Sequence, residues 1–409
     1  MPVAGVDLKT FVADRLLARN PISRALFNRE ADRLARACEQ MAERFLAGGR
    51  LLAFGRGAAA TDAQHVSVEF VHPVIVGKRA LPALDLSVAF ERWLPAIVTA
   101  SDIVIGFSAP DGDATISETL RQADSAGALT FALPGPRASF AVDAPSQDPF
   151  ISQELVEVLY HTLWETVHVF FEHGALRQAQ DAVSASNGAL RQAQHDLGAT
   201  AFLYPFLADG KQDTAAIVRD VAASIRAKAA DDERLRGEVA TNQCDRIAEA
   251  ASAVIRRLAA GATLLMFGNG GSATDANDWT IDCVMPPAGS PAIRAVSLAM
   301  EPANVTAIAN DVGVDTIFLR QLIAHGRRGD VAIAISTSGG SANVIAALEE
   351  ARKRGLLTVA LLGYDGGEIV RRGLADIPIV VGCDYIPRIQ EVQASIYHVL
   401  TEVWRRWMA

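Results

Sequence analysis

Two short loops in the second half of the chain combine glycine with hydroxyl side chains at points where a helix is expected to begin. The first, GNGGS (Gly268–Ser272), follows an apolar run, and the second, STSGGS (Ser336–Ser341), follows the apolar run VAIAI. Backbone N–H groups at a helix N-terminus lack intrahelical partners, and the helix dipole favours negative charge there. Both loops therefore have the chemistry of a phosphate site.

A single loop of this kind is weak support for a ligand site, because Ser and Gly are also ordinary turn and helix-capping residues. Two such loops, in the correct order within one strand–helix repeat, favour anion binding over capping. The hydroxyls and N–H groups of both loops would then converge on one phosphate.

The elements that must position these loops occur twice in the chain. The stretch from Ala47 to Phe70 lines up without a gap with a later stretch that contains the first loop, and both carry the tetrad Ala-Thr-Asp-Ala. Residues 101–133 match residues 329–363 in the same order of strand, loop, amphipathic helix and strand. Alternating buried strands and helices predict a parallel sheet covered on both faces, with ligands at the carboxyl ends of the strands.

The sequence therefore predicts an α/β protein of two tandem, doubly wound domains, each a three-layer αβα sandwich. We expect a first domain over residues 1–175, a helical linker over 176–212 and a second domain over 213–409, with helical N-terminal segments. The linker is predicted to be helical because GALRQAQD recurs as GALRQAQH with a period of 14 residues, which equals two heptads.

Composition and charge exclude several functional classes. Half of the residues are apolar and 21% are charged, as in a well-packed globular protein. The net charge of −9 argues against a broad nucleic-acid-binding surface. The 4 cysteines form no CxxC pair, so neither a disulfide framework nor a thiolate zinc site is indicated. The sequence shows no signal peptide and no apolar run long enough to span a membrane, so we expect a cytoplasmic protein without membrane partners.

The motifs FGNGGSATDA, AIANDVG, ISTSGGSANV, LLGYDGGE and RIQE, in that order, resemble the phosphoheptose isomerase branch of the SIS (sugar isomerase) family over nearly all of residues 213–409. The resemblance implies an enzyme that interconverts sedoheptulose 7-phosphate and D-glycero-D-manno-heptose 7-phosphate and uses no nucleotide cofactor. The residues that it implies for binding the phosphate or the sugar are Asn269, Ser272, Asp311, Ser336, Thr337, Ser338, Ser341 and Gln390.

Aldose–ketose isomerisation moves a proton between C1 and C2 through an enediol, so it needs a base, an acid and a group that stabilises the developing oxyanion. The family places a His and a Glu four residues apart on the helix after the first loop, and a Gln and a His eight residues apart on the last helix, often around zinc. The first half of this chain keeps the full quartet of His65, Glu69, Gln153 and His161. The resemblance implies that they hold zinc or another divalent metal, with Glu69 and His161 also catalytic; the alternative is that both histidines only pack between helices.

The two halves depart from the family pattern in complementary ways. In the first half, GRGAA replaces GNGGS, and Asp111 and Asp113 stand in the second loop, where they would repel a phosphate. In the second half, Asp278 and Asp282 stand where the family has His and Glu, while Gln390 and His398 are kept. Asp282 and His398 are therefore the catalytic candidates of the second half.

Three hypotheses follow. In the first, the halves pack as a pseudo-dimer, and the first-half quartet works beside the second-half phosphate loops in a composite site. In the second, catalysis stays within the second half. In the third, the protein is a non-catalytic phosphosugar sensor, or a protein-binding adaptor like DiaA, a replication regulator of the same branch. For all three we expect a phosphorylated sugar as ligand and a homodimer.

Overall fold

The structure is a computed structural model that describes residues 7–73, 78–183, 214–286 and 289–408. The chain divides into two compact units. We call residues 21–230 the first unit, and residues 1–20 together with 231–409 the second unit. In the part of the chain that the structure describes, no helix has the length and apolar character needed to cross a membrane. The predicted cytoplasmic location stays a prediction.

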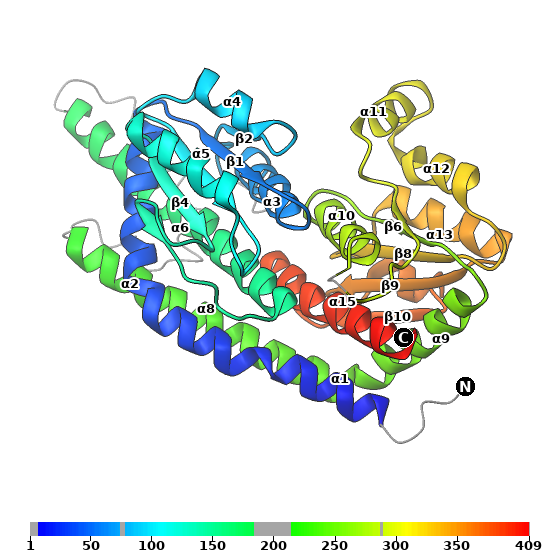
Figure 1. The fold of residues 1–409 in the computed structure, drawn as a ribbon. Coiled ribbons are helices and arrows are strands. Elements are labelled where there is room, and N and C mark those ends of the chain that lie inside the picture. Colours follow the sequence, from blue (N-terminus) through cyan, green and yellow to red (C-terminus); the bar gives the residue numbers. More distant parts are fainter. Residues whose placement is uncertain (1–6, 74–77, 184–213, 287–288, 409) are drawn as a thin grey trace. The chain divides into compact units, whose positions relative to one another are not determined.

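Within its described residues, the first unit has a 5-stranded sheet of parallel strands in the order β2-β1-β3-β4-β5 (Figure 1). The strands are β1 (Leu51–Gly55), β2 (Ala83–Asp85), β3 (Ile103–Phe107), β4 (Leu129–Leu133) and β5 (Phe140–Ala141). The helices are α2 (Arg19–Leu46), α3 (Ala59–Val71), α4 (Phe90–Ile97), α5 (Ala114–Ser125) and α6 (Pro149–Val183).

The three central strands of the first unit are apolar and fully buried, because helices cover both faces of the sheet. On one face, Met41 of α2, Phe70 of α3 and Leu159 of α6 share a core with Ile105 of β3. On the other face, α4 and α5 complete a smaller core, in which the rings of Phe54 and Phe90 stack with centroids 4.6 Å apart. This unit is a three-layer αβα sandwich.

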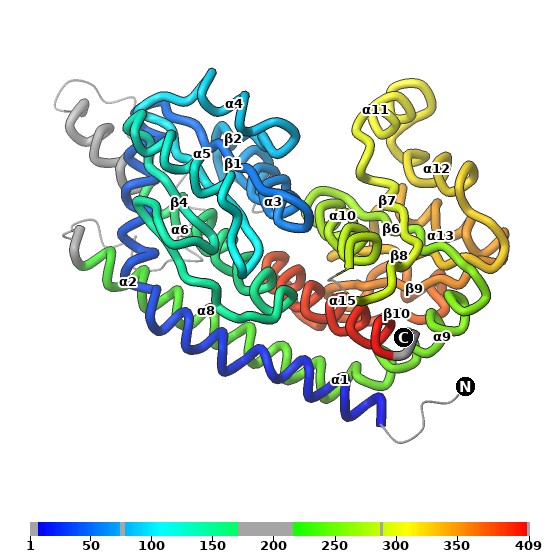
Figure 2. The backbone as a smooth tube through the Cα atoms, viewed as in Figure 1, coloured from blue at the N-terminus to red at the C-terminus, as the bar shows by residue number. Residues whose placement is uncertain are grey.

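The second unit repeats this architecture. Its described residues form a 5-stranded parallel sheet in the order β10-β9-β8-β6-β7 (Figure 2). The strands are β6 (Leu264–Phe267), β7 (Ala295–Ser297), β8 (Val331–Ser336), β9 (Leu357–Gly363) and β10 (Ile377–Val381). The helices are α1 (Leu8–Leu17), α8 (Thr214–Asn242), α9 (Cys244–Ala259), α10 (Gly271–Val284), α11 (Pro302–Asp311), the 3-10 turn η2 (Val314–Thr316), α12 (Ile317–His325), α13 (Ala342–Arg354), α14 (Gly367–Arg371) and α15 (Ile386–Met408).

Packing in the second unit brings α10 and α15 together on one face of its sheet. The indole of Trp279 on α10 stacks on Trp404 and on Tyr397 of α15, with ring centroids 5.4 and 5.3 Å apart. Its Nε1–H donates to the Thr401 hydroxyl at 2.8 Å, so the indole is fixed both by ring stacking and by a hydrogen bond. The opposite face is covered by α12 and α13, with Leu322 and Leu348 in a separate core.

The helical segments that begin the two halves are exchanged between the units. Helix α1 packs in the second unit, and the N-terminal part of α8 packs in the first. Val12 and Leu16 of α1 are buried in the core of the second unit, and Arg15 Nε lies 2.5 Å from a carboxylate oxygen of Glu402. Conversely, Val221 and Ile225, on the N-terminal part of α8, are buried in the core of the first unit. The unit boundaries therefore fall inside α2 and α8.

The predicted fold class is confirmed: both halves form a parallel sheet with helices on its two faces. Most of the predicted linker, residues 184–213, lies outside the described residues. The predicted domain bounds of 1–175 and 213–409 stay predictions. The compact units add that residues 7–20 pack with the second unit.

Gly339 allows the loop after β8 to approach its neighbour closely. Its φ of +59° lies in the left-handed region, and a Cβ placed there would lie 2.1 Å from the Gly366 carbonyl oxygen. The neighbouring Gly340 has open surroundings, since the nearest atom to its Cβ would be the Ser338 hydroxyl at 3.8 Å. Only one of the two glycines is therefore required by the backbone.

We predict that Gly339→Ala destabilises the protein by roughly 2 kcal/mol or more, because the alanine meets both an unfavourable φ and a backbone clash. Gly340→Ala is the matched control and should change stability by less than about 0.5 kcal/mol. Chemical denaturation of both variants measures the difference. Equal stability of the two variants would contradict this account of the loop.

Candidate functional site

The two predicted phosphate loops of the second unit emerge at the same edge of its sheet. Strands β6 and β8 are paired neighbours, with Phe267 opposite Ala334. Because the strands are parallel, the loop after β6 and the loop after β8 begin side by side. The side-chain amides of Asn269 and Asn343 join the loops, each donating to the other's Oδ1 at 2.9 Å.

The hydroxyls of these loops belong to segments that lead into helices whose N-cap residues make no side-chain capping hydrogen bond. Ser272 and Ser336 are buried, whereas Ser338 is exposed at the tip of the loop. Ser341 occupies the N-cap position of α13, yet its hydroxyl makes no capping hydrogen bond. The N-cap of α10 is Gly270, which offers no side chain. At α10 the N–H groups of Ser272 and Ala273 donate to the carbonyl oxygens of Asn269 and Gly270, and at α13 the N–H group of Val344 donates to Asn343 Oδ1. An external anion would be held by the remaining N–H groups of the two helix ends and by the loop hydroxyls.

In the corresponding loop of the first unit, a carboxylate of the chain itself occupies the helix N-terminus where an anion would bind. Asp113 is the N-cap of α5, and its Oδ1 accepts hydrogen bonds from the N–H groups of Thr115 at 2.7 Å and Ile116 at 3.0 Å. A pocket of about 400 Å³ lies beside this loop, and Asp111, Asp113 and Asp143 contribute to its lining. Carboxylates take the place that a phosphate would need, which explains why the first unit is unsuited to phosphate.

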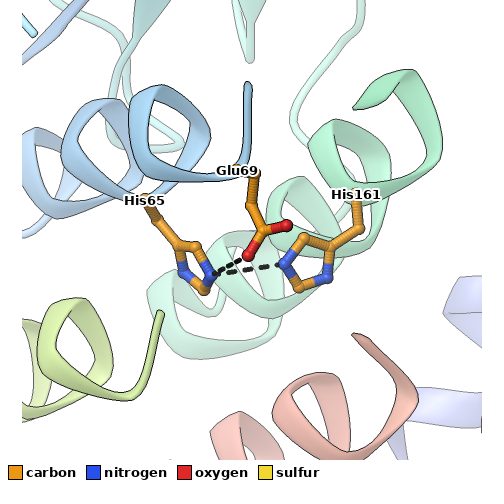
Figure 3. A group of neighbouring side chains, drawn as sticks. All are labelled: His65, Glu69 and His161. Carbon is orange, nitrogen blue, oxygen red and sulfur yellow. Dashed lines mark hydrogen bonds and ion pairs between the residues drawn. The ribbon is translucent and has the colours of Figure 1, made fainter. Parts of the chain in front are cut away.

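Three of the four predicted metal ligands of the first unit come together as a group of buried side chains (Figure 3). His65 and Glu69 lie one turn apart on α3, and His161 reaches them from α6. The Nε2 atoms of His65 and His161 are 3.4 Å apart, and His65 Nε2 is 3.7 Å from Glu69 Oε1. All three side chains are buried, with Glu69 and His161 at 0% exposure.

The geometry of this cluster fits a divalent metal. Two imidazole nitrogens bound tetrahedrally to one zinc ion, at about 2.0–2.1 Å each, would lie about 3.3 Å apart, close to the separation seen here. Neither carboxylate oxygen of Glu69 accepts a hydrogen bond from any described residue, although both are buried. A buried carboxylate without hydrogen bonds is costly unless a cation compensates it. The three residues can therefore supply a His₂Glu ligand set.

Gln153, the fourth predicted ligand, lies nearby on α6. Its amide nitrogen is 3.4 Å from both the Ala58 carbonyl oxygen and a carboxylate oxygen of Asp62, at the start of α3. These contacts tie α6 to α3 beside the cluster. Coordination of a metal by Gln153 stays a prediction.

The second unit holds a cluster at the matching positions. Asp278 and Asp282 lie one turn apart on α10, and His398 comes from α15. His398 Nε2 is 3.2 Å from Asp282 Oδ2 and 3.5 Å from Asp278 Oδ2, and the three side chains are buried. The Tyr397 hydroxyl donates to Asp278 Oδ2 at 2.8 Å.

Burial, and then the charge of the adjacent Asp278 carboxylate, raises the pKa of Asp282 to about 6. A carboxyl group with a pKa near neutrality can both accept and return a proton, which is the property that a general base in an isomerisation needs. Trp279 of α10 stacks on two rings of α15, and this packing keeps Asp282 of α10 close to His398 of α15.

Two further residues were predicted to bind the sugar, Gln390 and Asp311. Gln390 is buried on α15, two turns before His398. Asp311 is exposed at the end of α11, where its carboxylate accepts a hydrogen bond from Asn310 at 2.7 Å. Two contributors were missed from the sequence: Asn343, which joins the phosphate loops, and Tyr397, which orients Asp278. For Tyr397 the sequence does offer a signal, because the pair Tyr-His recurs on the last helix of both halves, as Tyr160-His161 and Tyr397-His398.

Comparison with known proteins agrees with this geometry. The pattern of the SIS domain family matches residues 230–363. A phosphoheptose isomerase from Geobacter sp. (strain M21) is 40% identical over 191 residues, which cover 46% of this chain and 96% of that protein.

Two solved structures share the fold over nearly the whole chain. The C-terminal domain of glucosamine-fructose-6-phosphate aminotransferase from Francisella tularensis has a TM-score of 0.55 at 9% identity and covers 96% of this chain and 95% of its own. A putative tagatose-6-phosphate ketose/aldose isomerase from Clostridium novyi NT also has a TM-score of 0.55, at 8% identity, and covers 96% of this chain and 88% of its own. At such identities the likeness concerns the fold alone. The chain belongs to the SIS domain family, within its phosphoheptose isomerase branch, and has the SIS fold in both halves.

Proposed function

We propose that this protein is an aldose–ketose isomerase of phosphorylated heptoses, which interconverts sedoheptulose 7-phosphate and D-glycero-D-manno-heptose 7-phosphate. The observation that carries the proposal is the pair of helix N-termini in the second unit whose N-cap residues, Gly270 and Ser341, make no side-chain capping hydrogen bond. The loops that lead into these helices carry the hydroxyls of Ser272, Ser336, Thr337, Ser338 and Ser341. Backbone amides and hydroxyls in that arrangement hold a phosphate without needing a basic side chain.

The acid–base chemistry is assigned to the two buried clusters. In the first unit, His65, Glu69 and His161 would hold a divalent metal, zinc in our proposal, with Gln153 as a further ligand. The metal would polarise the sugar carbonyl and stabilise charge on its oxygen. Glu69 and His161 in the first unit, and Asp282 and His398 in the second, are the candidates for moving the proton between C1 and C2.

Of the two clusters, we propose the first-unit cluster as the one that carries out the chemistry. Along α10, ten positions separate Ser272 from Asp282, which corresponds to about 15 Å of helix. Asp282 is thus far along the helix from its own unit's phosphate loop. Catalysis within the second unit is the alternative.

A second candidate function is a non-catalytic adaptor, and one observation favours it. Helix α11 has no buried residue, and the neighbouring apolar side chains of Met300, Val312 and Val314 are exposed. An exposed apolar surface is typical of a protein-binding site. The buried, metal-competent cluster of the first unit argues against a pure adaptor, because binding a partner does not require it.

We predict that Glu69→Gln lowers kcat for sedoheptulose 7-phosphate by about 10²–10⁴-fold, because it removes a ligand and proton acceptor from the first-unit cluster. Ser338→Ala should raise KM about tenfold, because one hydrogen bond to a charged phosphate is worth about 1.5–3 kcal/mol. Steady-state kinetics with product identification measures both.

Glu118→Gln makes the same carboxylate-to-amide change at an exposed position of α5 and is the matched control, with unchanged kinetics expected. A nearly silent Glu69→Gln combined with an inactive Asp282→Asn would move catalysis into the second unit. An inactive wild-type protein that still binds the sugar phosphate would refute the isomerase.

Ser341→Asp would give α13 the N-cap that Asp113 already gives α5. We predict that it weakens phosphosugar binding at least ~100-fold, because a carboxylate then accepts the amides and repels the phosphate. Thermal stability should be unchanged or raised by about 1 kcal/mol, because the helix gains a cap. Isothermal titration calorimetry with sedoheptulose 7-phosphate measures the affinity.

The reciprocal change, Asp113→Ser, is the control for that experiment. It should lower stability by about 1 kcal/mol through loss of the cap and leave phosphosugar affinity unchanged. Retained affinity in Ser341→Asp would show that the phosphate does not bind at the α13 N-terminus.

A further inference from the structure

A pair of asparagine side chains joins the two glycine- and serine-rich loops of the second unit. Asn269 lies in the loop after β6, and Asn343 lies in the first turn of α13. The Nδ2 atom of each donates to the Oδ1 atom of the other at 2.9 Å. Asn269 is exposed, whereas Asn343 is buried, with 6% exposure. A buried amide therefore holds an exposed one through a reciprocal pair of hydrogen bonds.

A backbone N–H group fixes the way in which both amides face. The N–H group of Val344 donates at 2.9 Å to the side chain of Asn343, so the accepting atom must be the oxygen. The other terminal atom of Asn343 is then the nitrogen, and it must face the oxygen of Asn269. The start of α13 thus determines, through Asn343, the orientation of the Asn269 amide.

Asn269 keeps hydrogen-bonding capacity after this pairing. An asparagine amide has two N–H donors and an oxygen with two lone pairs, and the pair with Asn343 uses one donor and one lone pair of Asn269. The second N–H and the second lone pair belong to an exposed side chain beside the helix ends that we assign to phosphate. A sugar hydroxyl both donates and accepts, so it can use both of these groups. A fully ionised phosphate oxygen only accepts and can use the N–H alone.

The first half of the chain lacks both members of the pair. Arg56 stands at the position of Asn269, and Thr115 stands at the position of Asn343. The Arg56 guanidinium lies 3.9 Å from a carboxylate oxygen of Asp113, the residue that caps α5. The asparagine pair is thus present in the unit whose loops we assign to phosphate, and it is replaced in the unit whose loop carries its own carboxylate.

We propose that Asn343 is a positioning residue, which orients the Asn269 amide so that the site prefers the phosphate ester of a sugar to inorganic phosphate. This inference rests on the proposed function, because it assigns a specificity to the same phosphate site. Asn269 contacts a hydroxyl of the sugar, and Asn343 acts through Asn269 without touching the ligand. An exposed side chain that is held in one orientation before the ligand arrives loses less conformational entropy on binding.

Isothermal titration calorimetry with the full-length protein tests the proposal, with sedoheptulose 7-phosphate and inorganic phosphate as the two ligands. Asn343→Thr is the chosen change, because α5 carries Thr115 at the equivalent position. We expect it to weaken binding of the sugar phosphate about tenfold and binding of inorganic phosphate less than about twofold. Asn242→Thr makes the same change at an exposed position of α8 and is the matched control, with both affinities unchanged.

A double-mutant cycle shows whether Asn343 acts through Asn269. Asn269→Ala alone should also weaken binding of the sugar phosphate about tenfold, and adding Asn343→Thr should weaken it less than about twofold further. Effects that multiply, an unchanged affinity in Asn343→Thr, or an equal loss for both ligands would overturn the proposal. Wild-type protein that does not bind sedoheptulose 7-phosphate would instead refute the proposed function, and the inference with it.

A measurement on the unaltered protein covers the case in which Asn343→Thr does not fold. Nuclear magnetic resonance of protein labelled with nitrogen-15 in asparagine detects the side-chain amides, and the spectra of Asn269→Ala and Asn242→Thr identify two of them. The reciprocal pair predicts that the bonded N–H of Asn269 exchanges with solvent at least about tenfold more slowly than the amide of Asn242. Equal exchange rates would contradict the proposal.

Discussion

The packing of the last helix of each repeat against the helix after its first strand is the constraint on which the sites depend. In the first unit, α6 lies against α3 and brings His161 to His65. In the second, α15 lies against α10 and brings His398 to Asp282. The contact buries ionisable groups that are costly unless they are paired or bound to a cation. The Trp279 stack supplies part of the favourable packing, at about 0.5–1.5 kcal/mol for each aromatic pair beyond its area burial.

The two halves have diverged in different parts of the same fold. In the second unit, the N-cap residues of the helices after β6 and β8 make no side-chain capping hydrogen bond, and these helix ends form the phosphate site that we propose. The first unit has turned the equivalent helix end into an ordinary cap with Asp113, which stabilises α5 at the expense of anion binding. It nevertheless keeps a buried His₂Glu set. Each half also depends on a helical segment from the other, so separation of the halves would expose apolar side chains of α1 and α8.

Sequence periodicity was sufficient to predict the parallel sheets, the order of their elements and the positions of the glycine- and serine-rich loops, because these follow from local patterns of apolar, glycine and hydroxyl residues. Phosphate binding by these loops stays a prediction. The pairing of His65 with Glu69 was also local, at one helical turn. Their meeting with His161 depended on a family resemblance, since no local pattern places residues so far apart in sequence side by side. The helix exchange was not predicted, because an amphipathic helix does not specify which sheet it covers. Asp113 was expected to repel a phosphate, but its role as a helix cap needed the backbone geometry.

Proton transfer at the sugar is the most direct test of the proposed isomerase. The full-length protein, loaded with zinc, is incubated with sedoheptulose 7-phosphate in heavy water, and the products are analysed by mass spectrometry and nuclear magnetic resonance. An enediol whose proton exchanges with solvent predicts an aldoheptose 7-phosphate with deuterium at C2, and loss of the reaction when the metal is removed. Recovery of bound but unchanged and undeuterated substrate would contradict the account and leave a sugar-phosphate-binding protein without isomerase chemistry.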